Sequence, residues 1–158
     1  MNWFRRGVLV LGLLCFIGAE GCRRSHQEPP PPRWSYQGEL HKAIERADCI
    51  VVRDGGFDGP RPIDEQKVLF RITKPGEVRL VAENLRFETE QNRAPCHCIG
   101  YPGVDWFQGQ QRIAATSVQH CRAMRWKGFP SDGVLTPESG AWLKQWLISH
   151  GVKEDAIR

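Results

Sequence analysis

Apolar residues recur every three to four positions in three segments of the chain, a spacing typical of one buried face of a helix. These segments predict helices over 39–47 and 73–87, and a third that begins after Thr136. Thr73 and Thr136 are the expected N-caps, because a threonine hydroxyl accepts a hydrogen bond from the first helical turn. Gly151 is expected to end the last helix in a Schellman motif.

Shorter segments alternate apolar and polar residues, which is the pattern of half-buried strands. The predicted strands are 49–52, 67–73, 104–108, 111–118 and a last strand that ends at Trp126. Together the elements predict an α+β fold, in which a small antiparallel sheet is packed by two to three helices. The sheet would consist of a three-strand meander plus two further strands.

Two short turns are expected to fix the register of the meander. A two-residue turn at Gly109-Gln110 pairs residue 108 with 111, and therefore 106 with 113. A second tight turn at His120-Cys121 pairs residue 119 with 122. The apolar residues that these registers place on one face are Val104, Trp106, Ile113, Ala115, Met124 and Trp126. The last helix is expected to lie across this face.

The first 21 residues have the three parts of a secretory signal peptide. Arg5 and Arg6 form a short positive region, and residues 7–19 form an apolar run. This run is shorter than the roughly 20 apolar residues that a membrane-spanning helix needs. We therefore expect residues 1–21 to be a signal peptide.

The residues Ala19-Glu20-Gly21-Cys22 resemble a bacterial lipobox. The resemblance implies that Cys22 is lipidated and that the membrane is the protein's partner through this anchor. Arg23, rather than aspartate, follows the cysteine, which implies the outer membrane, facing the periplasm. Residues 22–35, with four consecutive prolines, would be the anchor and linker, and residues 36–158 a single α+β domain.

The composition narrows the function classes. The apolar fraction of 41% and the charged fraction of 25% are ordinary for a globular protein. The net charge of +4 is spread along the chain, so no nucleic-acid partner is expected. The sequence has none of the common hydrolase, P-loop, zinc-protease or dinucleotide motifs, which argues against an enzyme. A protein partner in the envelope stays open.

Four cysteines remain once Cys15 in the signal peptide and Cys22 are set aside. They are Cys49, Cys96, Cys98 and Cys121. An even number of cysteines in an exported domain first suggests disulfides. The meander is expected to bring Cys98 near Cys121, and a bridge between these two cysteines would stabilise the fold by about 3 kcal/mol. Cys49 would then pair with Cys96 or stay a buried thiol.

The same residues allow two other interpretations. Cys96, Cys98 and Cys121, with His97 or His120, could hold Zn²⁺ or Cu⁺ as a cofactor, because thiolate and imidazole suit both ions. In an extended segment, however, alternation would turn the histidines away from the cysteines. Alternatively, Cys96 and Cys98 form a redox pair that His97 activates.

The segments 96–100, 120–126 and 142–151 resemble a loosely defined group of uncharacterised bacterial proteins that share a C-x-C-x-G segment. Those relatives often carry glycine at the position of Cys121, and the resemblance implies no known activity. The sequence therefore favours a lipid-anchored cell-envelope protein that is a non-catalytic binding or structural module stabilised by cysteine cross-links. A metal-binding envelope protein is the first alternative and a thiol redox protein the second.

Overall fold

The computed structural model describes residues 36–88, 96–129 and 131–157. The predicted signal peptide, the lipidation at Cys22 and the linker lie outside these residues. No helix in the described ranges is long and apolar enough to cross a membrane.

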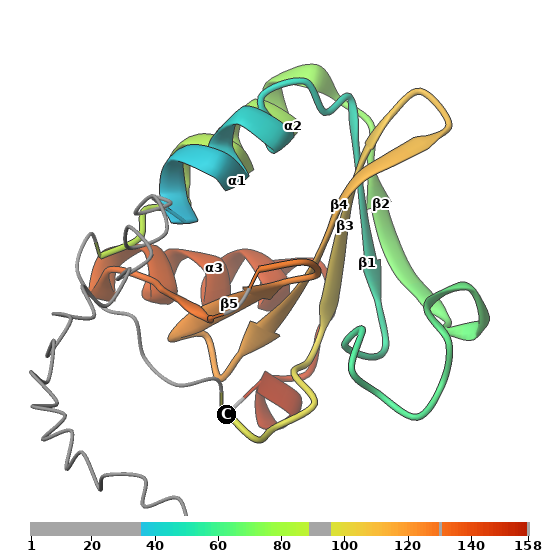
Figure 1. The fold of residues 1–158 in the computed structure, drawn as a ribbon, viewed down its shortest axis with the longest axis vertical. Coiled ribbons are helices and arrows are strands. Elements are labelled where there is room, and N and C mark those ends of the chain that lie inside the picture. Colours follow the sequence, from blue (N-terminus) through green and yellow to red (C-terminus); the bar gives the residue numbers. More distant parts are fainter. Residues whose placement is uncertain (1–35, 89–95, 130, 158) are drawn as a thin grey trace, which may run out of the picture. The chain divides into compact units, whose positions relative to one another are not determined.

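An antiparallel sheet is the centre of the described part of the chain, with its six strands in the order β2-β1-β3-β4-β5-β6 (Figure 1). The strands are β1 (Cys49–Arg53), β2 (Val68–Ile72), β3 (Gly103–Gln108), β4 (Gln111–Gln119), β5 (Ala123–Trp126) and β6 (Gly133–Val134). The α+β prediction and the β3-β4-β5 meander are confirmed. The two earlier strands join the meander through β1, which pairs with β3. Strand β6 was not predicted, because two residues carry no alternation.

Helices cover one face of this sheet (Figure 1). They are α1 (Tyr36–Ile44), α2 (Pro75–Asn84) and α3 (Pro137–Ser149), and the described residues also contain the short 3₁₀ helices η1 (Ile63–Glu65) and η2 (Glu154–Ile157). Their apolar residues and those of the strands form one core, in which Trp106 is completely buried. Burial of a large aromatic side chain is among the strongest single contributions to such a core.

Strand β4 presents the face opposite to the predicted one. Gln108 pairs with Gln111 as expected, but a β-bulge next to Trp106 shifts the register, so Trp106 pairs with Ala114 instead of Ile113. Ala114 is therefore in the core, and Ile113 is only partly buried. A one-residue shift has this effect because side chains alternate between faces along a strand.

The second turn of the meander is also one residue longer than predicted. Gln119 pairs with Ala123, so residues 120–122 form a three-residue loop. His120 and Cys121 both have positive φ angles, of 53° and 50°. The extra residue in this loop offsets the bulge, so Met124 lies on the predicted face although β4 does not.

The predicted helix ends are partly correct. The hydroxyl of Thr136 accepts a hydrogen bond from the backbone N–H of Ser139 at 3.3 Å, as expected of an N-cap. The Schellman motif at Gly151 is also present, because the N–H of Val152 donates to the carbonyl of Leu147 at 3.0 Å. The predicted cap at Thr73 is wrong. Helix α2 begins one residue later than that cap implies, and no side chain caps it.

The sheet face away from the helices is polar, and a buried ion pair lies on it. Arg53 donates to the carboxylate of Asp105 through two nitrogens, at 2.8 Å and 2.6 Å, and the two residues are 2% and 0% exposed. Arg53 also donates to the side chain of Gln66, which itself donates to the carbonyl of Gly56. The pair thereby fixes the β1–β2 connection to the sheet.

Replacement of Asp105 by alanine should lower the free energy of unfolding by about 3–5 kcal/mol, because it leaves the buried Arg53 guanidinium without its counter-charge. Denaturant unfolding monitored by tryptophan fluorescence measures this change. Glu39→Ala is the matched control, since it removes the exposed pair with Lys42 and should cost about 0–0.5 kcal/mol. A similar small loss in both variants would contradict the role assigned to the buried pair.

Candidate functional site

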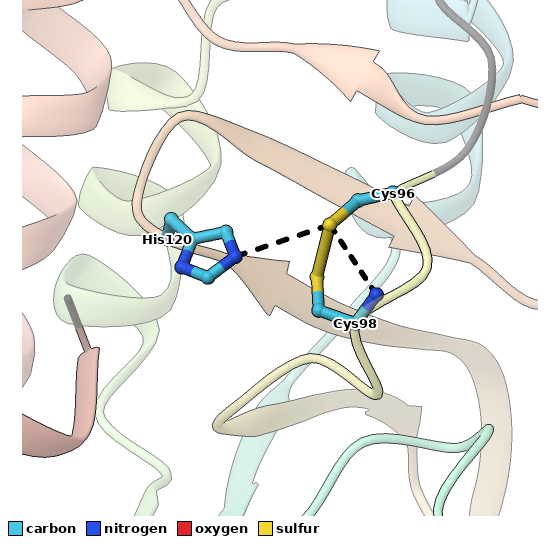
Figure 2. Close-up of side chains that lie close together, drawn as sticks. All are labelled: Cys96, Cys98 and His120. Carbon is cyan, nitrogen blue, oxygen red and sulfur yellow. Dashed lines mark hydrogen bonds between the residues drawn. A yellow bond between two sulfur atoms is a disulfide. The ribbon is translucent and has the colours of Figure 1, made fainter.

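Cys96, Cys98 and His120 lie together where the segment before β3 meets the β4–β5 loop (Figure 2). Cys96 and Cys98 form a disulfide with their Cα atoms 5.3 Å apart. The His120 Nε2 atom lies 3.9 Å from the Sγ of Cys96. All three potential ligand atoms lie within 4.8 Å of one another. The two cysteines are half-buried and His120 is exposed, so the group is at the protein surface.

This arrangement differs from the one expected for the cysteines. Cys98 is bridged to Cys96 instead of Cys121, and Cys49 and Cys121 are free, buried thiols. The expected separation of His120 from the cysteines is wrong for two physical reasons. Residues 96–100 are not an extended strand, and the loop that carries His120 is longer than a two-residue turn.

Two of the candidate residues lie outside the group. His97 is exposed, and its ring nitrogens are not among the grouped ligand atoms. Cys121 is 7% exposed and belongs to the apolar core. Burial raises the pKa of the Cys121 thiol to about 11, so this thiol stays protonated at neutral pH.

Arg125 on β5 holds the cysteine segment against the sheet. Its guanidinium donates to the backbone carbonyls of Cys96 and Cys98, the latter at 3.2 Å. It also forms a two-nitrogen pair with the carboxylate of Asp132, at 2.7 Å and 3.1 Å, and a bond to Asp58 at 2.7 Å. Asp132 in turn accepts from the backbone N–H of Cys96 at 2.9 Å. Hydrogen bonds in which one partner is charged are stronger than those between neutral groups, and here they fix both ends of the C-x-C segment.

Position 100, two residues after Cys98, has a backbone conformation and a packing environment that only glycine fits. Its φ angle is +80°, which glycine adopts without steric cost. A Cβ at this position would lie 2.5 Å from the Nε2 of Gln119 and 2.8 Å from the Oγ of Ser117. Glycine therefore lets the backbone approach β4 closely, and this approach places Cys98 over Gln119.

Gln119 and a small cavity form the surroundings of Cys98. The buried Oε1 of Gln119 lies 2.6 Å from the Sγ of Cys98. A cavity of about 190 Å³ is lined by Cys98, Tyr101 and His120, and by Ile157 from η2. The disulfide thus borders a space that an external group can enter.

Arg125, Gln119 and Asp132 were missed by the sequence reasoning. Arg125 alternates with the apolar residues Met124 and Trp126, which indicates the polar face of the sheet but no particular partner. Gln119 is the last residue of β4, and its role depends on a register that was predicted one residue out.

Comparison of the chain with models of known protein families, with curated proteins and with solved structures finds no match.

Arg125→Gln should lower the free energy of unfolding by about 1.5–3 kcal/mol, because hydrogen bonds to a charged group are lost. Amide hydrogen exchange should rise specifically in residues 96–102, which Arg125 holds in place. Arg122→Gln is the matched control, since Arg122 is a nearby exposed arginine and its loss should change stability by less than about 0.5 kcal/mol. Unchanged exchange in residues 96–102 of the Arg125 variant would show that another contact orders the segment.

Proposed function

We propose that the protein is a thiol redox protein of the bacterial cell envelope, and that Cys96 and Cys98 are its thiol–disulfide exchange couple. The observation that carries the proposal is the bridge itself, which joins two residues separated by a single residue at a surface site beside His120. The sequence alone had favoured a non-catalytic module stabilised by cross-links. The position of the bridge at the surface beside His120 favours thiol exchange over a purely structural role.

Cross-linking is a poor account of this bridge. On the chain-entropy estimate, closing a loop of three residues stabilises a fold by only about 1.6 kcal/mol. A Cys98–Cys121 bridge would contribute about twice as much by the same estimate. The observed bridge lies within one short segment and joins no two separate elements. The same segment is already held against the sheet by Arg125 and by the close approach of Gly100 to β4. A chemical role is the better explanation for a half-buried disulfide of this kind.

The surroundings of the two sulfurs suggest how exchange proceeds. An incoming thiolate enters the cavity and attacks the Sγ of Cys98. A bond forms between these two sulfurs, the Cys96–Cys98 bond breaks, and Cys96 leaves as a thiolate. The leaving sulfur accepts a hydrogen bond from the backbone N–H of Cys98 at 3.3 Å, and the His120 imidazole lies 3.9 Å away (Figure 2). Both contacts are suited to developing negative charge on Cys96.

A second substrate thiolate completes the reduction of the cysteine pair. It attacks the first substrate sulfur of the mixed disulfide, which releases Cys98 and removes both substrate sulfurs as one disulfide. The two substrate thiolates have then lost two electrons, and these electrons have reduced the Cys96–Cys98 disulfide to two thiols. Cys98 takes up a proton from solvent, and its S–H group donates to the Oε1 of Gln119, 2.6 Å away. The site therefore offers a distinct hydrogen-bonding partner to each sulfur of the reduced pair.

The location belongs to the same proposal and depends on the lipobox-like Ala19-Glu20-Gly21-Cys22. We place the protein on the periplasmic side of the outer membrane, held by a lipid on Cys22. Disulfides persist in such a compartment, whereas the cytosol keeps thiols reduced. A thiol–disulfide couple would there meet the thiols of other exported proteins.

Trapping of mixed disulfides tests the exchange chemistry. The oxidised wild-type protein is treated briefly with reduced glutathione, the reaction is stopped with acid and free thiols are alkylated, and the mixed disulfide is located by peptide mass spectrometry. We expect the glutathione adduct to form at least about tenfold faster on Cys98 than on Cys96, because Cys98 borders the cavity. Cys121 serves as an internal control and should stay unmodified, because it is buried.

The wild-type protein supplies the decisive measurement. Equilibration in glutathione buffers of graded potential should convert the Cys96–Cys98 pair reversibly between disulfide and dithiol while circular dichroism stays native. A bridge that opens only when the protein unfolds would overturn the redox function. An adduct that forms faster on Cys96 would overturn the assignment of the attacked sulfur.

Metabolic labelling with palmitate tests the anchor in a bacterial host. The wild-type protein should incorporate the label and fractionate with membranes, and Cys22→Ala should lose both properties, because Cys22 is the proposed acceptor. Cys15→Ala is the matched control and should keep them. Label that persists in the Cys22→Ala variant would exclude this residue as the lipidation site.

A further inference from the structure

We infer that the reduced form of the site binds a thiophilic cation, Zn²⁺ or Cu⁺, through the Sγ atoms of Cys96 and Cys98 and the Nε2 atom of His120. This binding goes beyond the proposed redox exchange, because it uses the dithiol state and transfers no electrons. Thiolate sulfur and imidazole nitrogen are the donors that both ions prefer in proteins.

The distances fit a metal site with little rearrangement. With Zn–S bonds of about 2.3 Å and Zn–N bonds of about 2.0–2.1 Å, tetrahedral ligands lie about 3.6 Å apart for S and N and about 3.8 Å for two sulfurs. The Cys96 Sγ to His120 Nε2 distance is already 3.9 Å. Reduction frees the two sulfurs to separate, and Cα atoms 5.3 Å apart allow this by side-chain rotation alone.

The surrounding contacts hold the two cysteine ligands in place. Arg125 donates to the backbone carbonyls of Cys96 and Cys98, and Asp132 accepts from the N–H of Cys96. The N–H of Cys98 also donates to the Sγ of Cys96 at 3.3 Å. Such outer contacts orient metal ligands and strengthen binding. His120 projects from the β4–β5 loop toward the sulfurs (Figure 2). Three protein ligands at a surface site leave a fourth zinc position for water.

Two neighbouring residues have side chains that could bind a metal ion, but their positions exclude them from this site. They therefore serve as matched controls. Cys121 follows His120 directly but is packed in the apolar core. His97 lies between the two cysteines but its ring is outside the group of ligand atoms. Metal binding should therefore depend on His120 but not on His97, and on Cys96 and Cys98 but not on Cys121.

Metal binding and the disulfide exclude each other, because the bridge uses the same sulfur atoms. Oxidation of the pair must release the ion, and a bound ion must slow oxidation. Redox state therefore decides whether the site holds a cation. This exclusion provides a control that needs no mutation and leaves the fold unchanged.

Competition with a chromogenic chelator tests the inference on the full-length protein, reduced chemically and transferred to anaerobic buffer. Separate titrations with Zn²⁺ and with Cu⁺ show which ion the site takes. We expect one ion per chain for at least one of them, a loss of about 100-fold or more in affinity for Cys96→Ser and Cys98→Ser, and of about tenfold or more for His120→Gln. His97→Gln and Cys121→Ser should bind as the wild type does.

Circular dichroism confirms that each variant is folded before its affinity is compared. Oxidised wild-type protein should bind no ion at this site, whatever the variants do. The inference is overturned if reduced protein binds neither ion, or if the affinity is unaffected by Cys96→Ser, Cys98→Ser and His120→Gln. Because the protein is reduced chemically, this test does not depend on the exchange activity, and either proposal can fail without the other.

Discussion

The register of β4 between β3 and β5 is the constraint on which the rest of the structure depends. A bulge on its β3 side and a three-residue loop on its β5 side shift this one strand relative to both neighbours. Ala114 and Val118 therefore lie in the core, and Ser117 and Gln119 lie on the opposite face. Without this shift, Gln119 would point into the apolar core and could not contact Cys98.

Two long connections of the chain pack against the polar face of the sheet. Arg53, which pairs with Asp105, donates to Gly55 and Gln66 of the connection 54–67. The Arg125–Asp132 pair binds the backbone of Cys96 and Cys98. Arg125 also reaches Asp58, so the two loops are linked. Buried and half-buried charges are costly unless fully paired. The same cost makes these pairs effective at selecting one loop conformation.

The sequence predicted the elements better than the contacts between them. Alternation and helical spacing identify the meander and its neighbouring strands because both are local properties. Thr136 and Gly151 were predicted as helix ends for the same reason. The bulge beside Trp106 has no local signal, so the faces of β4 were predicted the wrong way round, whereas the longer second turn returns β5 to its predicted face. The cysteine pairing was missed because the C-x-C segment was treated as extended.

The position of Cys121 shows how the site is separated from its nearest cysteine. Its φ angle of 50° lies in a region that glycine adopts without cost, and its thiol is buried away from Cys96 and Cys98. A glycine in place of Cys121 would relieve the loop and remove none of the three atoms proposed for exchange and metal binding. The proposed chemistry therefore depends on the length of the loop and on His120, which the longer loop places beside the disulfide, and Cys121 contributes only its packing in the core.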